Sequence, residues 1–369
     1  MNKYYRFIGG TLLGLVLTAC GGGGGGSSNN DQTDSQGSAG DGSVVNTGLS
    51  GQFFFVYQDA AYVKDVQTGV NTKIPNTDWE DQNNRFPSGV AAFYATASSY
   101  DQAEFVVEVD RCQRSGPDPL DPYETCIAIQ DYNGNYTGGF NLLYSLSSSV
   151  RLSRDRQYVA MVRDLDDPWL AIYTRDGTFI SNSQVETSSF AWLPDGRLIY
   201  AQDRRVLFTD PYSTVAVTQL TLPATMPTGV IGWLAVSPDG SRIAFSIIQE
   251  SNFAVTHAIP FVMNTDGSNI RQLAREPNEP SPNIGPVTWS PDGQWMFLRA
   301  GGADGQDPNA PGVLGYGYVI PANEDRALVL SPIDSERSPA VIKLRHYLIG
   351  SAAETLTDRF SSTGYSWQP

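Results

Sequence analysis

The sequence predicts an all-β fold built from repeated units of four short strands. Its 369 residues include 36 Gly and 23 Pro, which punctuate turns, and only 17% of the residues are charged. A turn motif containing Pro, Asp and Gly recurs along the chain, and each copy precedes a short run of strand-forming residues. These observations favour strands joined by tight turns over helices.

The turn motif defines the repeat. Its copies are Trp192-Leu-Pro-Asp-Gly196, Val236-Ser-Pro-Asp-Gly240, Trp289-Ser-Pro-Asp-Gly293 and the degenerate Leu152-Ser-Arg-Asp-Arg156. Successive aspartates are 40, 44 and 53 residues apart, which fits the four-stranded blades of a β-propeller. Proline presets φ, aspartate accepts a hydrogen bond from the backbone that follows it, and glycine supplies a left-handed conformation. We therefore expect these aspartates to form hairpins rather than to act as catalytic acids.

A second series of turns lies between the copies of the first. Its members are Asp131-Tyr-Asn-Gly134, Arg175-Asp-Gly177 and Thr265-Asp-Gly267, each after an apolar run. Together the two series resemble the repeat of TolB-like propellers and of the propeller domains in relatives of prolyl oligopeptidase. The resemblance covers residue 88 to about residue 294 and implies the fold. It implies little about function, because propellers host unrelated activities.

The turns also predict the number of blades. We place the turns between third and fourth strands near Gln67, Asn133, Asp176, Pro211, Asp266 and Asn323, which gives six blades. Residues 331–362 are unassigned, so seven blades remain an alternative. Tyr365-Ser-Trp-Gln-Pro369 resembles a motif cut off at its turn, and residues 51–74 look like the other strands of the same blade. We expect the termini to share that blade, which removes open sheet edges.

The first residues have the features of an export signal. Lys3 and Arg6 precede an apolar run at residues 8–17 that is too short to span a bilayer. Leu17-Thr-Ala-Cys20 then resembles the lipobox of bacterial lipoproteins, which implies a signal peptide at 1–19 and a lipidated Cys20. A plain secretory signal with an accidental cysteine is the alternative.

The region after Cys20 reads as a tether. Residues 20–50 are rich in Gly, Ser and Asn and contain few large apolar side chains, so we expect a disordered linker before a propeller at 51–369. By resemblance to sorted lipoproteins, Gly21 favours anchoring to the outer membrane over retention in the inner one. We expect the protein at the periplasmic face, with the cell surface as the alternative. If Cys20 carries lipid, Cys112 and Cys126 remain as a pair in an oxidising compartment, where we expect a disulfide. Two unpaired thiols are the alternative.

Composition and motifs exclude several function classes. The formal net charge of −15 disfavours nucleic acid as a partner. The chain has two histidines, His257 and His346, without metal-binding spacing, and no Gly-x-Ser-x-Gly nucleophile motif. We expect no cofactor, no metal and no catalytic residue, although enzyme activity stays uncertain. A calcium site in the Asp-rich residues 164–169 is an alternative to a solvated loop.

Propeller geometry predicts where partners bind. Both series of short turns share one face, and the long irregular segments gather on the other, where recognition is usually carried. These segments are residues 76–87, 111–125, 164–169, 249–258, 275–286 and 301–312. The residues that we expect to contact a partner are Trp79, Tyr123, Asp166, Asp167, Trp169, Arg204, Arg205 and Phe253. Each could instead pack within its loop.

The favoured function is a membrane-anchored, noncatalytic module, a monomer that binds an envelope protein or peptide. A carbohydrate-binding or lyase-type propeller is the alternative.

Overall fold

The structure is a computed structural model, and its compact unit spans Thr47–Pro369, four residues more than the predicted propeller. The residues that it describes are 49–57, 60–67, 70–75, 93–98, 104–114, 123–143, 147–163, 169–184, 189–212, 218–251, 254–277, 284–300, 316–331, 333–344 and 366–368. Leu49 is 1% exposed, so the core includes residues that we had assigned to the linker. Among the described residues no helix is long and apolar enough to cross a membrane.

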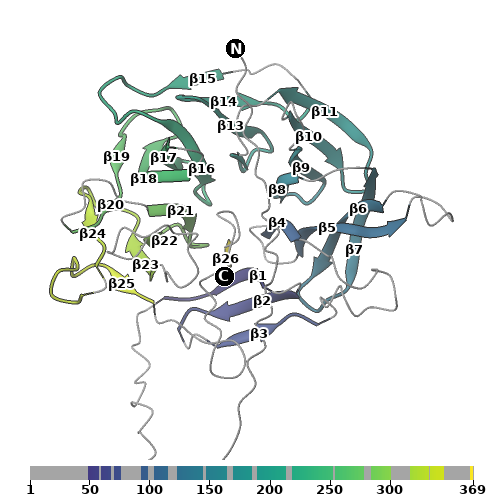
Figure 1. Cartoon of the computed structure of the whole chain (residues 1–369), viewed down its shortest axis with the longest axis horizontal. Coiled ribbons are helices and arrows are strands. Elements are labelled where there is room, and N and C mark those ends of the chain that lie inside the picture. Colours follow the sequence, from purple (N-terminus) through teal and green to yellow (C-terminus); the bar gives the residue numbers. More distant parts are fainter. Residues whose placement is uncertain are drawn as a thin grey trace, which may run out of the picture. The chain divides into compact units, whose positions relative to one another are not determined.

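The described elements are all strands, arranged as six four-stranded antiparallel sheets around a common centre (Figure 1). This confirms the predicted six-bladed propeller. Blade 1 contains β26 (Ser366–Gln368), β1 (Gln52–Tyr57), β2 (Ala60–Asp65) and β3 (Asn71–Lys73), from the inside outwards. Blade 2 contains β4 (Phe93–Ser98), β5 (Glu104–Arg114), β6 (Tyr123–Asp131) and β7 (Tyr136–Leu143). Blade 3 contains β8 (Ser147–Leu152), β9 (Tyr158–Arg163), β10 (Trp169–Thr174) and β11 (Phe179–Gln184).

The second half of the ring follows the same plan. Blade 4 contains β12 (Phe190–Trp192), β13 (Leu198–Gln202), β14 (Arg205–Thr209) and β15 (Thr218–Thr221). Blade 5 contains β16 (Val230–Val236), β17 (Arg242–Ser251), β18 (Ala254–Asn264) and β19 (Arg271–Gln272). Blade 6 contains β21 (Ile284–Trp289), β22 (Trp295–Ala300), β23 (Tyr316–Pro321) and β25 (Ile342–Lys343). A short parallel pair, β20 (Ala274–Arg275) with β24 (Leu328–Val329), lies between the outer parts of blades 5 and 6. Five of the six predicted turns between third and fourth strands lie where expected. In blade 6 a turn follows β23 at Asn323, but it leads into β24, and β25 comes later in the chain.

The two ends of the folded unit meet in blade 1, as predicted. β26 pairs antiparallel with β1, with Phe53 opposite Trp367. The Trp367 indole Nε1 donates a hydrogen bond to the Ser50 carbonyl at 3.0 Å. The Phe53 ring contacts the rings of Trp367 and Phe297, with centroids 4.9 and 4.8 Å away. The ring is therefore closed by strand pairing and by apolar packing.

The motif turns are held by the aspartate hydrogen bonds that the sequence suggested and, in addition, by bonds of the serine hydroxyl. Ser290 Oγ donates to Asp292 at 2.6 Å and accepts from the Trp295 backbone N–H at 2.8 Å. Asp292 also accepts from the Gln294 N–H at 3.0 Å, and Gly293 has φ 69°. The turns at Ser153 and Ser237 repeat this pattern. The aspartates are hairpin formers, as predicted.

Blade 4 departs from this pattern in an instructive way. Its motif has Leu193 in place of serine, and the Leu193 N–H bonds to the Arg197 carbonyl, four residues on. In blade 6 the Ser290 N–H bonds to Trp295, five residues on. The turn without serine is therefore one residue shorter, because it lacks the hydroxyl that would accept the extra backbone N–H.

Candidate functional site

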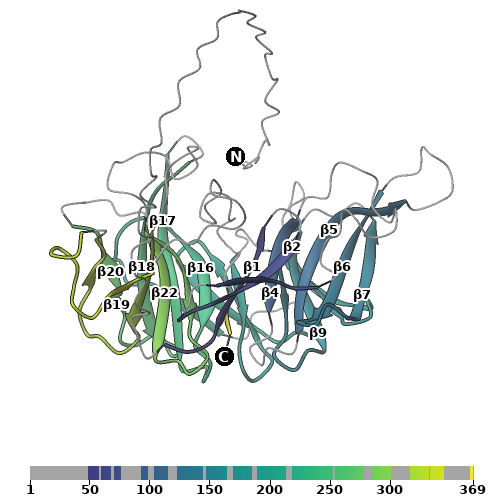
Figure 2. The ribbon, with the colours of Figure 1, turned by 90° about the horizontal axis from the view of Figure 1, so that it is seen from below.

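The two ends of the strands differ in kind. The turns of both series lie at one end, which we call the turn face, and the connections between second and third strands lie at the other, the loop face (Figure 2). On the turn face the two turn series bond to each other within a blade: the Arg175 N–H donates to Gln157, and the Thr265 N–H to Ser241, both at 2.9 Å. The turn face is therefore a hydrogen-bonded frame.

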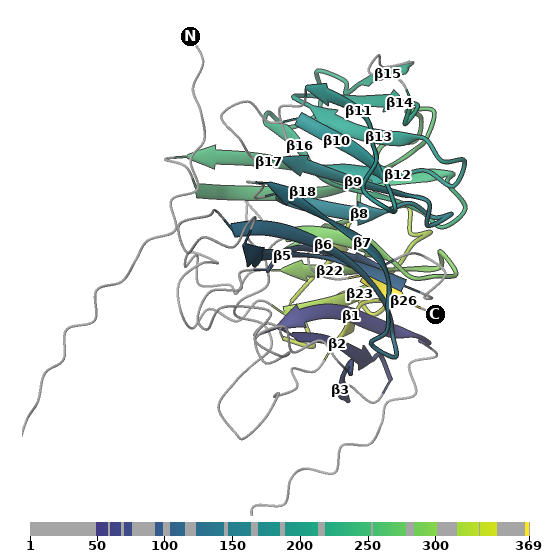
Figure 3. The same ribbon diagram turned by 90° about the vertical axis from the view of Figure 1, so that its right-hand side faces the viewer.

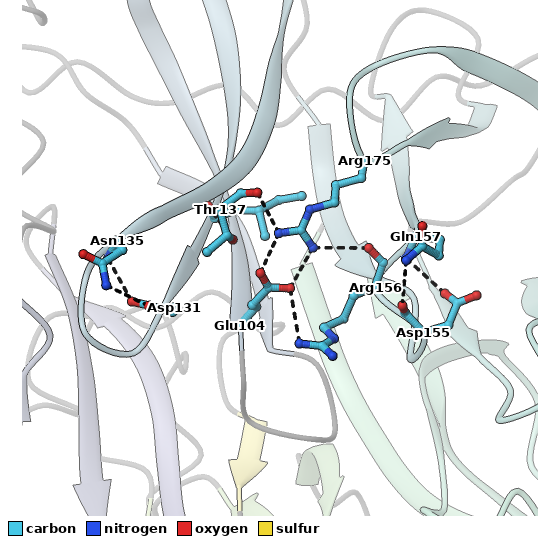
Figure 4. A network of polar contacts seen from close by, with 9 residues as sticks. Glu104, Asp131, Asn135, Thr137, Asp155, Arg156, Gln157 and Arg175 are labelled. Carbon is cyan, nitrogen blue, oxygen red and sulfur yellow. Dashed lines mark hydrogen bonds and ion pairs between the residues drawn. The ribbon is translucent and has the colours of Figure 1, made fainter.

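Glu104 and Arg175 join blades 2 and 3 on this frame (Figure 4). Glu104 begins β5 and is 7% exposed. Arg175, in the turn after β10, donates to its two carboxylate oxygens at 2.7 and 2.5 Å and to the Thr137 carbonyl at 2.9 Å. This hydrogen-bonded contact lowers the pKa of Glu104 against the opposing effect of burial, and raises the pKa of Arg175.

A second arginine completes this cluster. The Arg156 guanidinium lies 3.9 Å from the Glu104 carboxylate. The backbone carbonyl of Arg156 accepts a hydrogen bond from Arg175 at 3.3 Å. Arg156 has φ 61° at the position where other motif copies have glycine, so its side chain is available at the blade junction at the cost of backbone strain. The neighbouring turns are tied locally, for example by Asn135 to Asp131 at 2.9 Å (Figure 4).

Arg154 makes a longer connection across the ring. From the blade 3 motif it donates to the carbonyls of Ser237, at 2.9 Å, and Pro238 in the blade 5 motif. Blade 4 lies between these two blades, and its motif turn is the one that is a residue shorter. The shortened turn and the crossing arginine therefore occur at the same place.

An open groove of about 460 Å³ lies on the turn face between blades 5 and 6. Its lining residues are Arg242, Val262, Met263, Asn264, Asn269, Ile270, Arg271, Asn323 and Asp325. Burial is the main cause that lowers the pKa of Arg271, and the neighbouring charge of Arg242 adds to it, while Asp325 and Glu324 oppose it. No group of three or more metal-ligating side chains occurs in the described ranges.

The loop face carries two hairpins that project beyond the others. β5 and β6 have 11 and 9 residues, and β17 and β18 have 10 and 11. Figures 2 and 3 show β17 and β18 reaching past the neighbouring strands at the end opposite the turns. We had expected irregular segments at 111–125 and 249–258. The structure instead has paired strands over 111–114, 123–125, 249–251 and 254–258.

The predicted contact residues fall into three groups. Trp169 begins β10 and is half-buried. Arg204 donates to the carbonyls of Pro227 and Pro223, at 2.6 and 3.0 Å, so it holds the loop before β16, while Arg205 donates to Gln202 at 2.8 Å. The side chain of Tyr123, at the start of β6, lies outside the described part of the structure. So do the whole residues Cys20, Trp79, Asp166, Asp167 and Phe253.

The cysteines that we paired lie on neighbouring strands. In the β5–β6 pairing Val109 is opposite Cys126, and the register shifts between Val109 and Gln113, the segment that contains Cys112. The Cys112 side chain is outside the described part, so the disulfide stays a prediction.

The sequence analysis did not find the groove between blades 5 and 6, because Arg242 and Arg271 are 29 positions apart and carry no motif of their own.

Comparisons with known proteins found similarity to solved structures alone. No family model and no curated protein matches the sequence. Among solved structures, a protein of unknown function from Bacteroides caccae is similar, with 10% identity and a TM-score of 0.47. A candidate TolB from Agrobacterium tumefaciens is similar too, with 13% identity and a TM-score of 0.45. Each alignment covers 80% of this chain and 100% of the other. We take no site or activity from these similarities.

Proposed function

We propose that the protein is a noncatalytic interaction module of the bacterial envelope, anchored through Cys20, that binds a protein or peptide at its loop face. The observation that carries this proposal is the pair of projecting hairpins, β5–β6 and β17–β18. They belong to blades 2 and 5, which are three blades apart and so stand on opposite sides of a six-bladed ring. A partner seated on the loop face could contact both.

The turn face supports this assignment by what its side chains do. Arg154, Arg175 and Arg242 each donate to groups in another blade, so these three side chains hold the ring together. A rigid ring fixes the spacing of whatever the loop face presents, which lowers the entropy cost of binding. The proposed contacts are Tyr123, which begins β6, Phe253, which lies in the sequence between β17 and β18, and Trp79, Asp166, Asp167, Trp169 and Arg205.

Arg204 is proposed to act indirectly, through the loop that it holds. Its guanidinium donates to three carbonyls, of Pro223, Pro227 and Gly229. Its charge therefore fixes the loop that leads into β16, and its contribution to binding would come through that loop. Within the described residues no observation favours the carbohydrate-active alternative.

Anchoring is tested by Cys20→Ser. The variant should lose palmitate labelling and move from the membrane to the soluble fraction, while its melting temperature stays unchanged, because residues 20–50 are proposed to separate the anchor from the fold. Equal labelling of the variant and the parent would refute lipidation at this cysteine.

Binding is tested by replacing the hairpin aromatics together. Protein carrying Tyr123→Ala and Phe253→Ala should capture at least severalfold less partner from envelope extracts after crosslinking, since aromatic anchors contribute most to interfaces. Tyr212→Ala is the matched control, because Tyr212 is an aromatic of the turn face that is 64% exposed. The control should capture as the parent does. Equal loss in both variants, with unchanged melting, would contradict the choice of face.

A further inference from the structure

We propose that the groove between blades 5 and 6 binds a carboxylate group through Arg242 and Arg271. The source of the carboxylate would be a small organic acid or the free end of a peptide chain. This site is on the turn face, so it is separate from the proposed partner surface and stands or falls independently of it.

The two arginines converge on one carbonyl, and within the described residues neither of them contacts a carboxylate directly. Arg242 Nη1 and Arg271 Nη2 both donate to the Ala322 carbonyl, at 2.8 and 2.7 Å. In the described part of the chain neither guanidinium forms an ion pair, whereas Arg175, at the junction of blades 2 and 3, contacts Glu104 at 2.5 Å. Two cations that meet on one neutral oxygen repel each other, and a bound anion would relieve that repulsion.

Arg242 is held in place before any ligand arrives. It donates to the Asn323 side-chain oxygen and to the Gly293 carbonyl, both at 3.0 Å. Its guanidinium carbon also lies 4.6 Å from the centre of the Trp289 ring, a cation–π contact. A cation fixed in this way loses little conformational entropy on binding.

The groove has donors left for a ligand. Within the described residues, the Nε and Nη1 groups of Arg271 and the side-chain amide of Asn269 make no hydrogen bond. A guanidinium can bind both oxygens of a carboxylate with two parallel N–H groups. The volume of about 460 Å³ lies within the range of small-ligand sites, roughly 300 to 1,000 Å³.

The surrounding charges favour a carboxylate over a phosphate. Asp325 lines the groove, and it and Glu324 act on Arg271 from close by. The chain as a whole has a formal net charge of −15. Both effects penalise a doubly charged anion more than a singly charged one.

The test uses the full-length protein in detergent micelles and titration calorimetry. The probes are sodium acetate and the tripeptide acetyl-Gly-Gly-Ala, with its C-terminus free or amidated. We expect saturable binding of the free tripeptide and none of the amidated one. If acetate binds as well as the free tripeptide, the site recognises a small acid; if only the tripeptide binds, it recognises a chain end. Both results support a carboxylate site.

Three variants decide which groups carry the binding. Arg271→Gln should weaken it by about tenfold or more, because a charge-assisted hydrogen bond is lost. Asp325→Asn should strengthen it, because a repelling charge is removed, and a purely structural role would not give that sign. Arg197→Gln is the control, since Arg197 is a turn-face arginine already paired with Asp195 at 2.7 Å, and its loss should leave binding unchanged.

The proposal is overturned by any of three results. One is the absence of saturable binding of either free carboxylate up to about 10 mM, which is weaker than ordinary recognition. Another is equal binding of the amidated tripeptide. The third is an unchanged affinity in Asp325→Asn. This result decides the matter if Arg271→Gln lowers the melting temperature, because the loss of binding in that variant could then come from unfolding.

Discussion

Replacing Gly240 by alanine should destabilise the ring more than the same change at Gly293 or Gly196. The three glycines occupy the same position of the turn motif, with φ of 75°, 69° and 88°. An L-residue in the left-handed region costs about 1 to 2 kcal/mol. Alanine also lowers the conformational entropy of the unfolded chain, which stabilises the folded protein by about 0.4 to 1 kcal/mol. This effect offsets part of the cost of the left-handed backbone. The backbone contribution is therefore the same at all three sites, about 1 kcal/mol.

The neighbouring blade makes the difference. A Cβ at Gly240 would lie 2.7 Å from Cδ and Cγ of Pro194 in blade 4, too close for carbon atoms. A Cβ at Gly293 would lie 3.6 Å from Pro238, an ordinary contact, and one at Gly196 has no atom within 4 Å. Because a proline ring cannot swing away, overpacking at Gly240 adds about 1 to 3 kcal/mol. We expect totals of about 2 to 4 kcal/mol for Gly240→Ala and about 1 kcal/mol for the other two.

Urea unfolding of the three variants measures these differences, and a double-mutant cycle identifies their cause. In a Pro194→Ala background the clash partner is gone, so Gly240→Ala should cost no more than Gly293→Ala does in the parent. Equal free energies of unfolding for all three variants would refute the argument from blade contacts. So would an unchanged cost of Gly240→Ala in the Pro194→Ala background.

Three further predictions concern the frame and the β5–β6 hairpin. Glu104→Gln should lower the free energy of unfolding by about 3 kcal/mol at neutral pH. Since the folded state lowers the pKa of Glu104, the parent should lose this advantage as the pH falls below about 4, and equal acid sensitivity of both proteins would contradict it. Ser290→Ala removes two hydrogen bonds and should cost about 1 to 3 kcal/mol in a urea titration; a cost near zero would mean that the turn needs no hydroxyl. Nonreducing peptide mapping should find Cys112 joined to Cys126, and alkylation of both thiols in envelope protein would exclude the bridge.

The motif serine shows how far local reasoning reaches. The sequence predicted the Pro-Asp-Gly turns, the glycine conformation and the position of five of the six turns between third and fourth strands. It did not predict the double role of Ser237, whose hydroxyl is the main cause that lowers the pKa of Asp239 to about 2. Nor did it explain why the turn with Leu193 is shorter. The bonds of Ser237 and the length of the turn at Leu193 both depend on which backbone N–H groups lack a partner in the opposite strand. Those N–H groups can be identified only when the register of the paired strands is known.

The candidate site was less accessible to the sequence than the fold. For Arg204 the sequence left open a contact with a partner or packing within its loop, and the structure shows that its guanidinium donates to three carbonyls of the loop before β16. Conversely, no sequence motif distinguishes Arg242 and Arg271 from other arginines. They form a groove only because blade 6 brings the Ala322 carbonyl between them.

What the sequence by itself determined is the repeating unit: a turn motif that acts within about five residues, its spacing along the chain, and the half-motif at Trp367 that closes the ring. Such features follow from local backbone preferences and from the period of the strands. The tertiary structure alone decided which blades are tied together, by Glu104 with Arg175 and by Arg154 across the ring. It also decided which hairpins project and where two cations meet. These contacts join residues tens of positions apart, and no local rule links their identities until the ring has closed around its centre.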